Sequence, residues 1–416
     1  MIKDNVVEIK KPDRFIDDPI SDILRQGARN LLAQALETEI DIFLNQYKDL
    51  RDENGLQRIV RNGFLPERQI QTGIGPVPVD VPRIRDRHQQ RSERLSFSSA
   101  ILPPYLRKTK SMEHLIPWLY LKGVSTGDFS DALAALVGKD APGLSAATIS
   151  RLKTVWQHDF QQWKKRSLEG KSYVYFWVDG IYCNVRMDDK QCLLVIMGAT
   201  ADGVKELVAI ESGFRESELS WRQLLLDLKS RGLTTAPKLA IGDGALGFWK
   251  ALSKVYDSTR WQRCWVHKTA NVLNSLPKSL QSKAKSQLHQ IWQAADKDEA
   301  KRHFDAFVNS YEAKYPKATN CLEKDCGALL TFYDFPAEHW RHILTSNPIE
   351  STFATVRLRT NKVRGCFSAI TVITMAFKLC QCAQKKWIRL HRTERLADVI
   401  KGVKFVDGLE AKRIAA

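Results

Sequence analysis

The sequence predicts an α/β protein whose sheet begins with an antiparallel meander. Two observations support this fold class. Apolar, β-branched and aromatic segments follow one another closely, at 173–178, 181–187, 191–199 and 206–210. Helical and strand patterns then alternate, with a helix at 216–231, a strand at 238–242, a helix to residue 256 and a strand at 260–266. This order is typical of a sheet covered by helices.

The charge balance indicates an anionic partner. Lys and Arg number 64 and Asp and Glu number 47, so the formal net charge is +17 in a chain of 416 residues. A large positive field attracts polyanions, and nucleic acid is the commonest partner of such chains. A basic solvated surface without a particular partner is the alternative.

The cysteines and the N-terminus predict a cytoplasmic protein with reduced thiols. Eight cysteines are scattered along the chain without a C-x-x-C pair, which argues against a four-ligand zinc site of the usual spacing. Residues 1–11 contain no apolar segment of signal-peptide type. No apolar run approaches the ~18 residues that a membrane span needs, so we expect no membrane partner.

Residues 1–110 predict a helix followed by a basic β and loop region. Apolar residues recur with a helical period over 23–47, and Ser21 or Asp22 is the candidate N-cap. The Gly and Pro residues of 58–87 exclude a long helix and favour short strands. We expect this region to bind DNA phosphates through its arginines, with Arg58, Arg61, Arg83 and Arg85 as candidates.

Residues 111–170 predict a second, helical DNA-binding region. A helix that starts near Ser145 and extends to 163 presents Arg151 and Lys153 on its polar face. A preceding helix at 126–137 would make a helix–turn–helix-like pair, although the turn at 138–144 is longer than usual. Two packed helices without a role in DNA binding are the alternative.

Asp179 and Asp243 share one sequence context, because each ends an apolar strand and is followed by Gly. In an open α/β sheet, ligands bind beyond the carboxyl ends of the strands, so neighbouring strands would point both carboxylates into one crevice. Carboxylate oxygens suit Mg²⁺ or Mn²⁺, and magnesium also binds phosphate oxygens. The pair therefore predicts phosphodiester chemistry, and two ordinary Asp-Gly turns are the alternative.

A third carboxylate, Glu350, is predicted in the first turn of a helix. Asn347 is the candidate N-cap and Pro348 the first helical residue. Glu350 would then either accept from the Asn347 N–H, as in a capping box, or serve as a rigidly held third metal ligand. The basic residues after it are expected to hold a phosphate backbone: Arg357, Arg359, Lys362 and Arg364.

The motifs around the second acid resemble those of a known family. Asp243-Gly-Ala-Leu-Gly247, Val255-Tyr256 and Gln262-Arg-Cys264-Trp-Val-His267 resemble the signature of the Mutator-type transposases, which include many bacterial insertion-sequence transposases. Asp257 departs from the signature, at a position where the family usually has Pro or Thr. The segments 31–44, 61–63, 81–86 and 345–350 also resemble the family, so the resemblance covers about residues 25–395.

The resemblance implies a ribonuclease-H-like catalytic core at 171–267 and 345–400. It also implies an all-helical insertion at 268–344. By its composition, the end of the chain at 401–416 is a basic tail. Its catalytic triad would be Asp179, Asp243 and Glu350, which would hold two Mg²⁺ or Mn²⁺ ions roughly 4 Å apart for DNA cleavage and strand transfer. The implied partner is double-stranded DNA, both the terminal inverted repeats and the target, bound by a homodimer or higher oligomer in the bacterial nucleoid.

Four further residues have expected roles in this picture. The family's C-x-x-H falls on Cys264 and His267, where we expect a structural or DNA-organising role. Their residue types alone would also fit half of a zinc site, or simple packing, which the lack of a second ligand pair favours. Trp292 and Trp340 lie in the expected insertion, where related transposases stack an aromatic on a flipped base. Packing in a core is the alternative, and it is favoured for both tryptophans.

Three other functions stay open at this point. A ribonuclease-H-like nuclease or resolvase would use the same acids, although the helical insertion and the basic N-terminal half favour a transposase. A non-catalytic DNA-binding protein derived from a transposase would be supported by the loss of an acid, but all three acids are present. An RNA-binding protein is weakly disfavoured, because no RRM or KH signature occurs.

Overall fold

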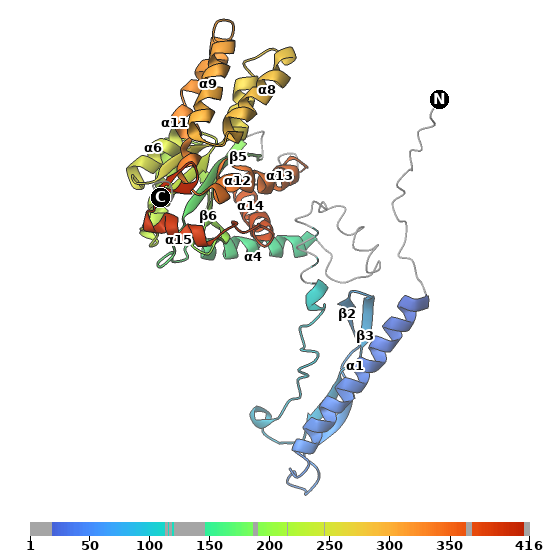
Figure 1. The fold of residues 1–416 in the computed structure, drawn as a ribbon. Coiled ribbons are helices and arrows are strands. Elements are labelled where there is room, and N and C mark those ends of the chain that lie inside the picture. Colours follow the sequence, from blue (N-terminus) through green and yellow to red (C-terminus); the bar gives the residue numbers. More distant parts are fainter. Residues whose placement is uncertain are drawn as a thin grey trace, which may run out of the picture. The chain divides into compact units, whose positions relative to one another are not determined.

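The computed structural model describes residues 19–112, 115, 119, 146–185, 190–213, 215–244, 246–362 and 368–411. It divides into two compact units, which we call unit 1 (Met1–Leu152) and unit 2 (Lys153–Ala416) (Figure 1). The predicted helix at 126–137 and the turn at 138–144 lie outside the described residues.

Residues 19–112 of unit 1 contain one long helix packed against two small antiparallel sheets. Its elements are α1 (Pro19–Gln46), β1 (Ile59–Phe64), β2 (Arg68–Thr72), β3 (Gly75–Val79), β4 (Pro82–Asp86) and the 3₁₀ turn η1 (Arg91–Glu93). β1 pairs with β4, and β2 pairs with β3. The helix and the short strands confirm the sequence prediction. The predicted N-cap is wrong, because α1 begins at Pro19 and includes Ser21 and Asp22.

The core of unit 1 lies between α1 and the strands. Leu36 is fully buried, and it packs with Ile70, Val77 and Val79 of the β2–β3 hairpin. Ile40, about one helical turn after Leu36, is the other buried residue of α1. The helical period also predicts three buried residues that are in fact exposed, namely Ile23, Leu24 and Leu31.

An ion pair fixes the end of the β1–β4 sheet. The Arg58 guanidinium donates from Nε and Nη2 to the two carboxylate oxygens of Asp86, at 2.8 and 3.0 Å. The Asp86 side chain is only 1 % exposed, and it also accepts from the backbone N–H groups of His88 and Leu95. Arg58 therefore holds the pKa of the Asp86 carboxyl well below its usual range, although burial opposes this and the two N–H groups assist it.

We expect Asp86→Asn to loosen this sheet, because Arg58 would lose its charged partner. The folded pKa of Asp86 is depressed, so its stabilisation is present above the unfolded pKa of about 3.9 and is lost as the pH falls below that value. At pH 7, hydrogen–deuterium exchange should become several-fold faster in peptides that cover β1 and β4. Asp80→Asn is the control, since Asp80 is exposed and contacts Arg29 at 3.7 Å. Equal protection in both variants would contradict this role of Asp86.

Unit 2 is built on a five-stranded mixed sheet. Its strands are β5 (Tyr175–Asn184), β6 (Lys190–Ala199), β7 (Lys205–Gly213), β8 (Leu239–Gly242) and β9 (Arg260–Arg263). Their order across the sheet is β7-β6-β5-β8-β9. The first three strands are antiparallel, whereas β8 and β9 run parallel to β5. The predicted α/β fold with an antiparallel meander first is confirmed.

One strand prediction is wrong in a way that concerns the site. The sequence predicts two strands, at 173–178 and 181–187, separated at Asp179-Gly180. The structure has a single strand, β5, in which Asp179 pairs with Val195 and Gly180 with Leu194 of β6. Since the hydrogen-bonded register with β6 continues through these residues, the Asp-Gly pair is no turn.

Helices cover both faces of this sheet. On one face, α5 (Glu218–Ser230) and α6 (Leu246–Val255) bury a core that includes Phe176, Leu194, Trp221 and Phe248. Two further helices contact the strands, α13 (Asn347–Lys362) at β5 and α14 (Ala369–Gln384) at β7. The helix α4 (Ala146–Lys164) packs on α14, where the rings of Phe160 and Phe377 are 5.3 Å apart.

The segment after β9 is helical, as predicted for 268–344. It contains α7 (Trp265–Leu273), α8 (Lys278–Gln293), α9 (Lys297–Tyr311), α10 (Pro316–Glu323), α11 (Cys326–Leu329), η3 (Thr331–Asp334), η4 (Ala337–His339) and α12 (Trp340–Ile343). Figure 1 shows α8 and α9 as a projecting pair, and they contact each other. The predicted strand at 260–266 is too long, because β9 ends at Arg263 and Cys264 caps α7.

The C-terminal residues have more structure than the sequence predicts. They form α15 (Glu394–Lys401) and a short hairpin of β10 (Phe405–Val406) and β11 (Leu409–Glu410). Gly408, in the hairpin turn, packs on Ala337 and Trp340 so closely that a Cβ at this position would clash with both. In the part of the chain that the structure describes, no helix has the length and apolar character of a membrane span.

Candidate functional site

Asp179 and Asp243 lie side by side at the end of β8. Val178 of β5 pairs with Gly242 of β8 in the parallel register, so the next residue of each chain segment is one of the two acids. The strands are neighbours, as the sequence argument required. Asp179 is 6 % exposed, and its Oδ1 accepts from the Gly180 N–H at 2.8 Å. Asp243 is half-buried.

The electrostatics of this pair favour a bound cation. The pKa of Asp179 is raised to about 7, mainly by burial and then by the charges of Asp243 and Glu216, while His267 and the hydrogen bond from Gly180 oppose the rise. Acids in this environment resist ionisation, and a divalent cation between them would remove that resistance.

Glu216 is a further acid at this site, and the sequence did not reveal it. It directly precedes Ser217, whose side chain caps α5 by accepting from Ser220 N–H. Its carboxyl group packs over Gly180, where an added Cβ would lie 2.4 Å from Glu216 Cδ. Burial, followed by the charge of Asp243, raises the pKa of Glu216 to about 7, and His267 opposes this. Among the described residues, its buried Oε2 has no hydrogen-bond partner.

The sequence pattern does not distinguish Glu216 as a residue of the site. The residue stands at the predicted start of a helix, where an acidic side chain is common because it complements the helix dipole. The feature that distinguishes it is the contact with Gly180, 36 residues earlier in the chain, and that contact comes from the tertiary fold alone.

Glu350 lies at the start of α13, the helix that packs against β5. Its Oε1 accepts a hydrogen bond from Ser346 Oγ at 2.6 Å and lies 3.5 Å from His267 Nδ1. The predicted capping box is wrong, because the Asn347 N–H donates to Thr345 Oγ1 at 3.4 Å and not to Glu350. The Glu350 side chain therefore does not serve as the cap that the sequence predicted.

Cys264 and His267 connect to Glu350 through Ser346. Ser346 is fully buried; its N–H donates to Cys264 Sγ at 3.3 Å, and its Oγ lies 3.3 Å from His267 Nδ1. The hydrogen bond with Cys264 raises the pKa of His267 to about 9; burial opposes this shift, and the charges of Cys264, Glu350 and Asp179 assist it. Burial raises the pKa of Cys264, but the hydrogen bonds from His267 and Ser346 outweigh it and leave the pKa below its ordinary value.

The potential metal-ligand atoms of Cys264, His267 and Glu350 all lie within 4.8 Å of one another, and this is the one set of three with that property among the described residues. Asp179, Asp243 and Glu350 do not form such a set. His267 interacts electrostatically with both Asp179 and Glu350. The raised pKa keeps His267 protonated beside these acids, where it offsets part of their negative charge; ligation of a metal would require the loss of this proton.

The residues predicted to contact DNA have different surroundings. Arg58 and Arg61 are in ion pairs, with Asp86 and Glu37. The exposed candidates are Arg83, Arg85, Arg151 and Arg357, and Lys153 is half-buried. Arg359 and Lys362 belong to α13, but their side chains, and Arg364 as a whole, lie outside the described residues.

The two candidate tryptophans also differ. Trp340 donates from Nε1 to the Phe335 carbonyl at 2.9 Å and packs edge-on against Phe332 and Tyr333. These contacts favour the core alternative for Trp340. Trp292 is half-buried, with its ring 5.1 Å from that of His289.

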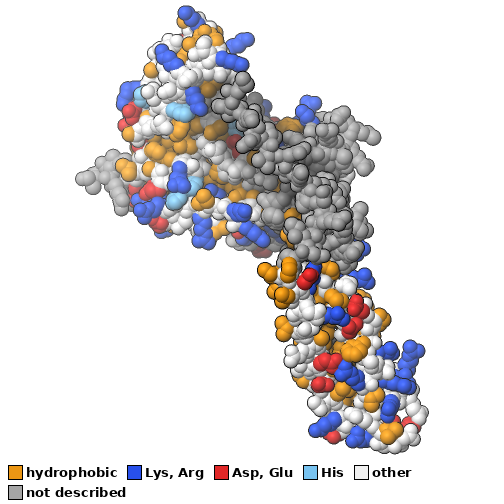
Figure 2. Space-filling model, turned by 90° about the vertical axis from the view of Figure 1, so that its right-hand side faces the viewer, with side chains coloured by type: hydrophobic (Ala, Val, Ile, Leu, Met, Phe, Trp, Pro, Cys, Tyr) orange, Lys and Arg blue, Asp and Glu red, His pale blue; other side chains and the backbone are white. Residues whose placement is uncertain are grey.

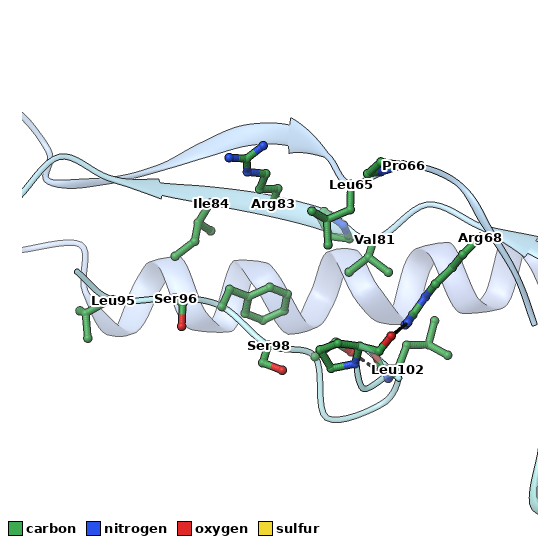
Figure 3. Close-up of a pocket in the computed structure, with 14 residues that line it drawn as sticks. Leu65, Pro66, Arg68, Val81, Arg83, Ile84, Leu95, Ser96, Ser98 and Leu102 are labelled. Atoms are coloured by element: carbon green, nitrogen blue, oxygen red, sulfur yellow. Dashed lines mark hydrogen bonds between the residues drawn. The ribbon is translucent and has the colours of Figure 1, made fainter. Parts of the chain in front are cut away.

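Unit 1 has a pocket of about 470 Å³ below the strands, lined mainly by apolar side chains such as Leu65, Val81 and Leu102 (Figure 3). Arg68 also lines it, but its guanidinium donates to the carbonyls of Leu102, Pro103 and Pro104. Since it offers no carboxylate, histidine or thiol, this pocket does not compete with the acids of unit 2 as a catalytic site.

Known proteins similar to this chain are insertion-sequence transposases. The family profile described as "Transposase, Mutator family" matches residues 2–389. The chain is 51 % identical over 288 residues to the transposase for insertion sequence element IST2 of Acidithiobacillus ferrooxidans. The matched region covers 68 % of this chain and 95 % of that protein. The chain is 50 % identical over 298 residues to the transposase for IS6120 of Mycolicibacterium smegmatis, covering 71 % and 92 %. Identity to the transposase for ISRM5 of Rhizobium meliloti (strain 1021) is 27 % over 390 residues, covering 93 % and 94 %.

Proposed function

The chain belongs to the Mutator family of transposases, and from this premise we propose that it is a DDE enzyme that cuts the ends of an insertion sequence and joins them to target DNA. The observation that supports the proposal is the position of Asp179 and Asp243, each directly after the last paired residues of β5 and β8, Val178 and Gly242. Double-stranded DNA, as terminal inverted repeats and target, is the proposed substrate. A homodimer or higher oligomer on DNA stays a prediction.

We propose a ribonuclease-H-like core at 171–267 and 345–400. Three antiparallel strands followed by two parallel ones, with the first acid on the central strand β5, support this assignment. The helical segment 268–344 would be an insertion between the second and third acids. The contact of α13 with β5 supports it, because this contact brings the helix of Glu350 back to the strand of Asp179.

The residues at the site fit Mg²⁺ or Mn²⁺. The carboxylates of Asp179 and Asp243 supply hard oxygen donors, and the buried, unpartnered Oε2 of Glu216 adds a third beside them. Bound Mg²⁺ would supply charge neutralisation at the scissile phosphate and activation of the attacking oxygen.

Each side chain would have a distinct task in the reaction. Asp179 and Asp243 would fix the position of the phosphate relative to the attacking oxygen, because both extend from the rigid sheet. Glu350 would complete the site from α13, held by Ser346. His267 would compensate the negative charge of Asp179 and Glu350 before DNA binds.

The test is a cleavage and joining assay on a labelled duplex that contains an end of the element. Wild-type protein should nick the end and join it to a second duplex with Mg²⁺, and do neither with EDTA. Nicking without joined product would favour the nuclease or resolvase alternative. Binding without nicking would favour the non-catalytic alternative.

Glu216→Gln should lower the cleavage rate about 10-fold or more, because it removes a carboxylate that supports the metal-binding acids. Without divalent cations, the variant should also melt at a higher temperature, since a buried carboxylate without a partner is replaced by a neutral amide. Glu218→Gln is the matched control, two residues along and half-buried, with its carboxylate paired to Lys254. Wild-type cleavage by Glu216→Gln would rule out this role.

Ser346→Ala should lower cleavage about 10- to 100-fold, which is the usual effect of losing a residue that orients a metal ligand. The variant removes the hydroxyl that donates to Glu350 Oε1 and leaves both acids of the sheet untouched. Its control is Ser351→Ala, an exposed serine of the same helix whose hydroxyl donates to the Pro348 carbonyl. If the two variants cleave equally well, Ser346 does not position Glu350.

A further inference from the structure

The outer face of the β1–β4 sheet in unit 1 has a row of arginines. β4 alternates, so Ile84 and Asp86 face the interior while Arg83 and Arg85 are exposed. Arg87 follows the strand and is also exposed. We call Arg83, Arg85 and Arg87 the outer arginine row. Figure 3 shows Arg83 extending to the side of β4 away from α1, and Ile84 extending toward α1.

The row borders a groove of about 540 Å³. Asn62 and Arg94 complete its polar lining. Asn62 comes from β1, two residues along from Val60, which pairs with Arg85, so it lies on the same outer face. Asp86 is the one acid among the lining residues; it is buried and bound to Arg58, so it adds no exposed negative charge to the groove.

The arginines in and beside the β1–β4 sheet fall into two classes by their partners. Arg58 and Arg61 are neutralised by Asp86 and Glu37. Within the described part of the chain, no hydrogen bond or ion pair is found for the side chains of Arg83 and Arg85. Among the described residues, Arg87 and Arg94 donate to the backbone carbonyls of Gln57 and His88 and have no acidic partner. Several like charges held together on a rigid strand are unfavourable unless a polyanion binds them.

We propose that the outer arginine row binds the phosphate backbone of duplex DNA without reading its sequence. Alternate residues of a strand are about 6.8 Å apart, so the row extends over roughly 14 Å, a length along which one DNA strand has several phosphates. The groove has no aromatic side chain among its lining residues, so it offers no platform for stacked bases and suits a duplex better than a single strand. The assignment is independent of the catalytic acids, because it concerns binding by unit 1 and requires no cleavage.

The test uses the full chain and a fluorescently labelled duplex of unrelated sequence, in EDTA. Anisotropy titrations from 50 to 250 mM salt give the slope of log K against log salt, which is about −0.9 for each phosphate neutralised. Arg83→Gln/Arg85→Gln should make the slope shallower by about 1.8, and at 0.1 M salt should weaken binding by roughly 60-fold. Melting temperature should stay at the wild-type value, since neither side chain has an intramolecular partner to lose.

Arg61→Gln is the matched control, because Arg61 belongs to the same β1–β4 sheet but is paired to Glu37. It removes one positive charge, as Arg85→Gln does, and should leave the slope unchanged, whereas Arg85→Gln alone should reduce it by about 0.9. Equal effects of the two single variants would overturn the proposal, as would a wild-type slope in the double variant or the absence of duplex binding by wild type. Because EDTA is present throughout, none of these results depends on whether the acids of unit 2 cut DNA.

Discussion

Asp179→Asn and Asp243→Asn should each abolish DNA cleavage, by at least about 1,000-fold. Each change would remove a proposed donor for the divalent cation. A cation at a transferring phosphate contributes several kcal/mol to its stabilisation, and about 1.4 kcal/mol is tenfold in rate. Binding of the duplex should persist. The measurement is the Mg²⁺-dependent nicking rate of each variant, beside its affinity for the same duplex in EDTA.

The same substitution at Asp179 should stabilise the metal-free protein. Its folded pKa of about 7 is above the unfolded value of about 3.9, so stability from the protonated group is full below pH 4 and is lost as the pH rises toward 7. Asn cannot ionise, and the melting temperature of Asp179→Asn should therefore exceed that of wild type by more at pH 8 than at pH 5. Mg²⁺ should raise the melting temperature of wild type and have little effect on the variant. A variant that melts below wild type at pH 8 would show that this acid is structural.

Glu350→Gln should also lower cleavage strongly, by about 100-fold or more, with the fold intact. The amide has the shape of the carboxylate and can still accept from Ser346 Oγ, so the link to Cys264 and His267 should survive. What it lacks is the negative charge that a metal ligand on α13 needs. Nicking assays and melting curves on the same preparation measure the two effects separately.

The control is a second substitution at the same position. Glu350→Ala removes both the charge and the acceptor, so it should lose cleavage as Glu350→Gln does and melt at a somewhat lower temperature. Near-normal cleavage by Glu350→Gln with destabilisation by Glu350→Ala would mean that Glu350 only anchors Ser346. The third acid of the site would then have to be another residue, and Glu216 would be the first candidate.

Local patterns in the sequence were sufficient to predict most elements of unit 2. Nearly continuous apolar segments predicted β6, β7 and β8, most of whose residues are buried on both faces of the sheet. The helical pattern predicted α5 and α6. The predicted strand boundary at Asp179-Gly180 is wrong because of the tertiary structure. The pairing of both residues with β6 continues the strand through a dipeptide that in isolation favours a turn.

Asp179 and Asp243 were predictable because each follows a strong apolar strand signal, although Asp179 lies within β5 and only Asp243 follows the end of its strand. The surroundings of Glu350 were not, since its contacts come from Ser346 and from His267, 83 residues earlier in the chain. Charge counting likewise could not separate Arg58 and Arg61, which have acidic partners, from Arg83 and Arg85. That distinction depends on which face of the β1–β4 sheet each side chain occupies.

We propose that Asp179, Asp243 and Glu350 share one divalent-cation site, and metal-directed cleavage of the protein backbone tests this assignment most directly. Fe²⁺ is added in place of Mg²⁺, ascorbate and peroxide generate hydroxyl radicals at the bound ion, and mass spectrometry maps the cuts. Cuts near residues 179, 243 and 350 together, suppressed by excess Mg²⁺, are the predicted result. Cuts confined to the neighbourhood of Cys264, His267 and Glu350 would contradict it, because they would place the metal in that cluster instead.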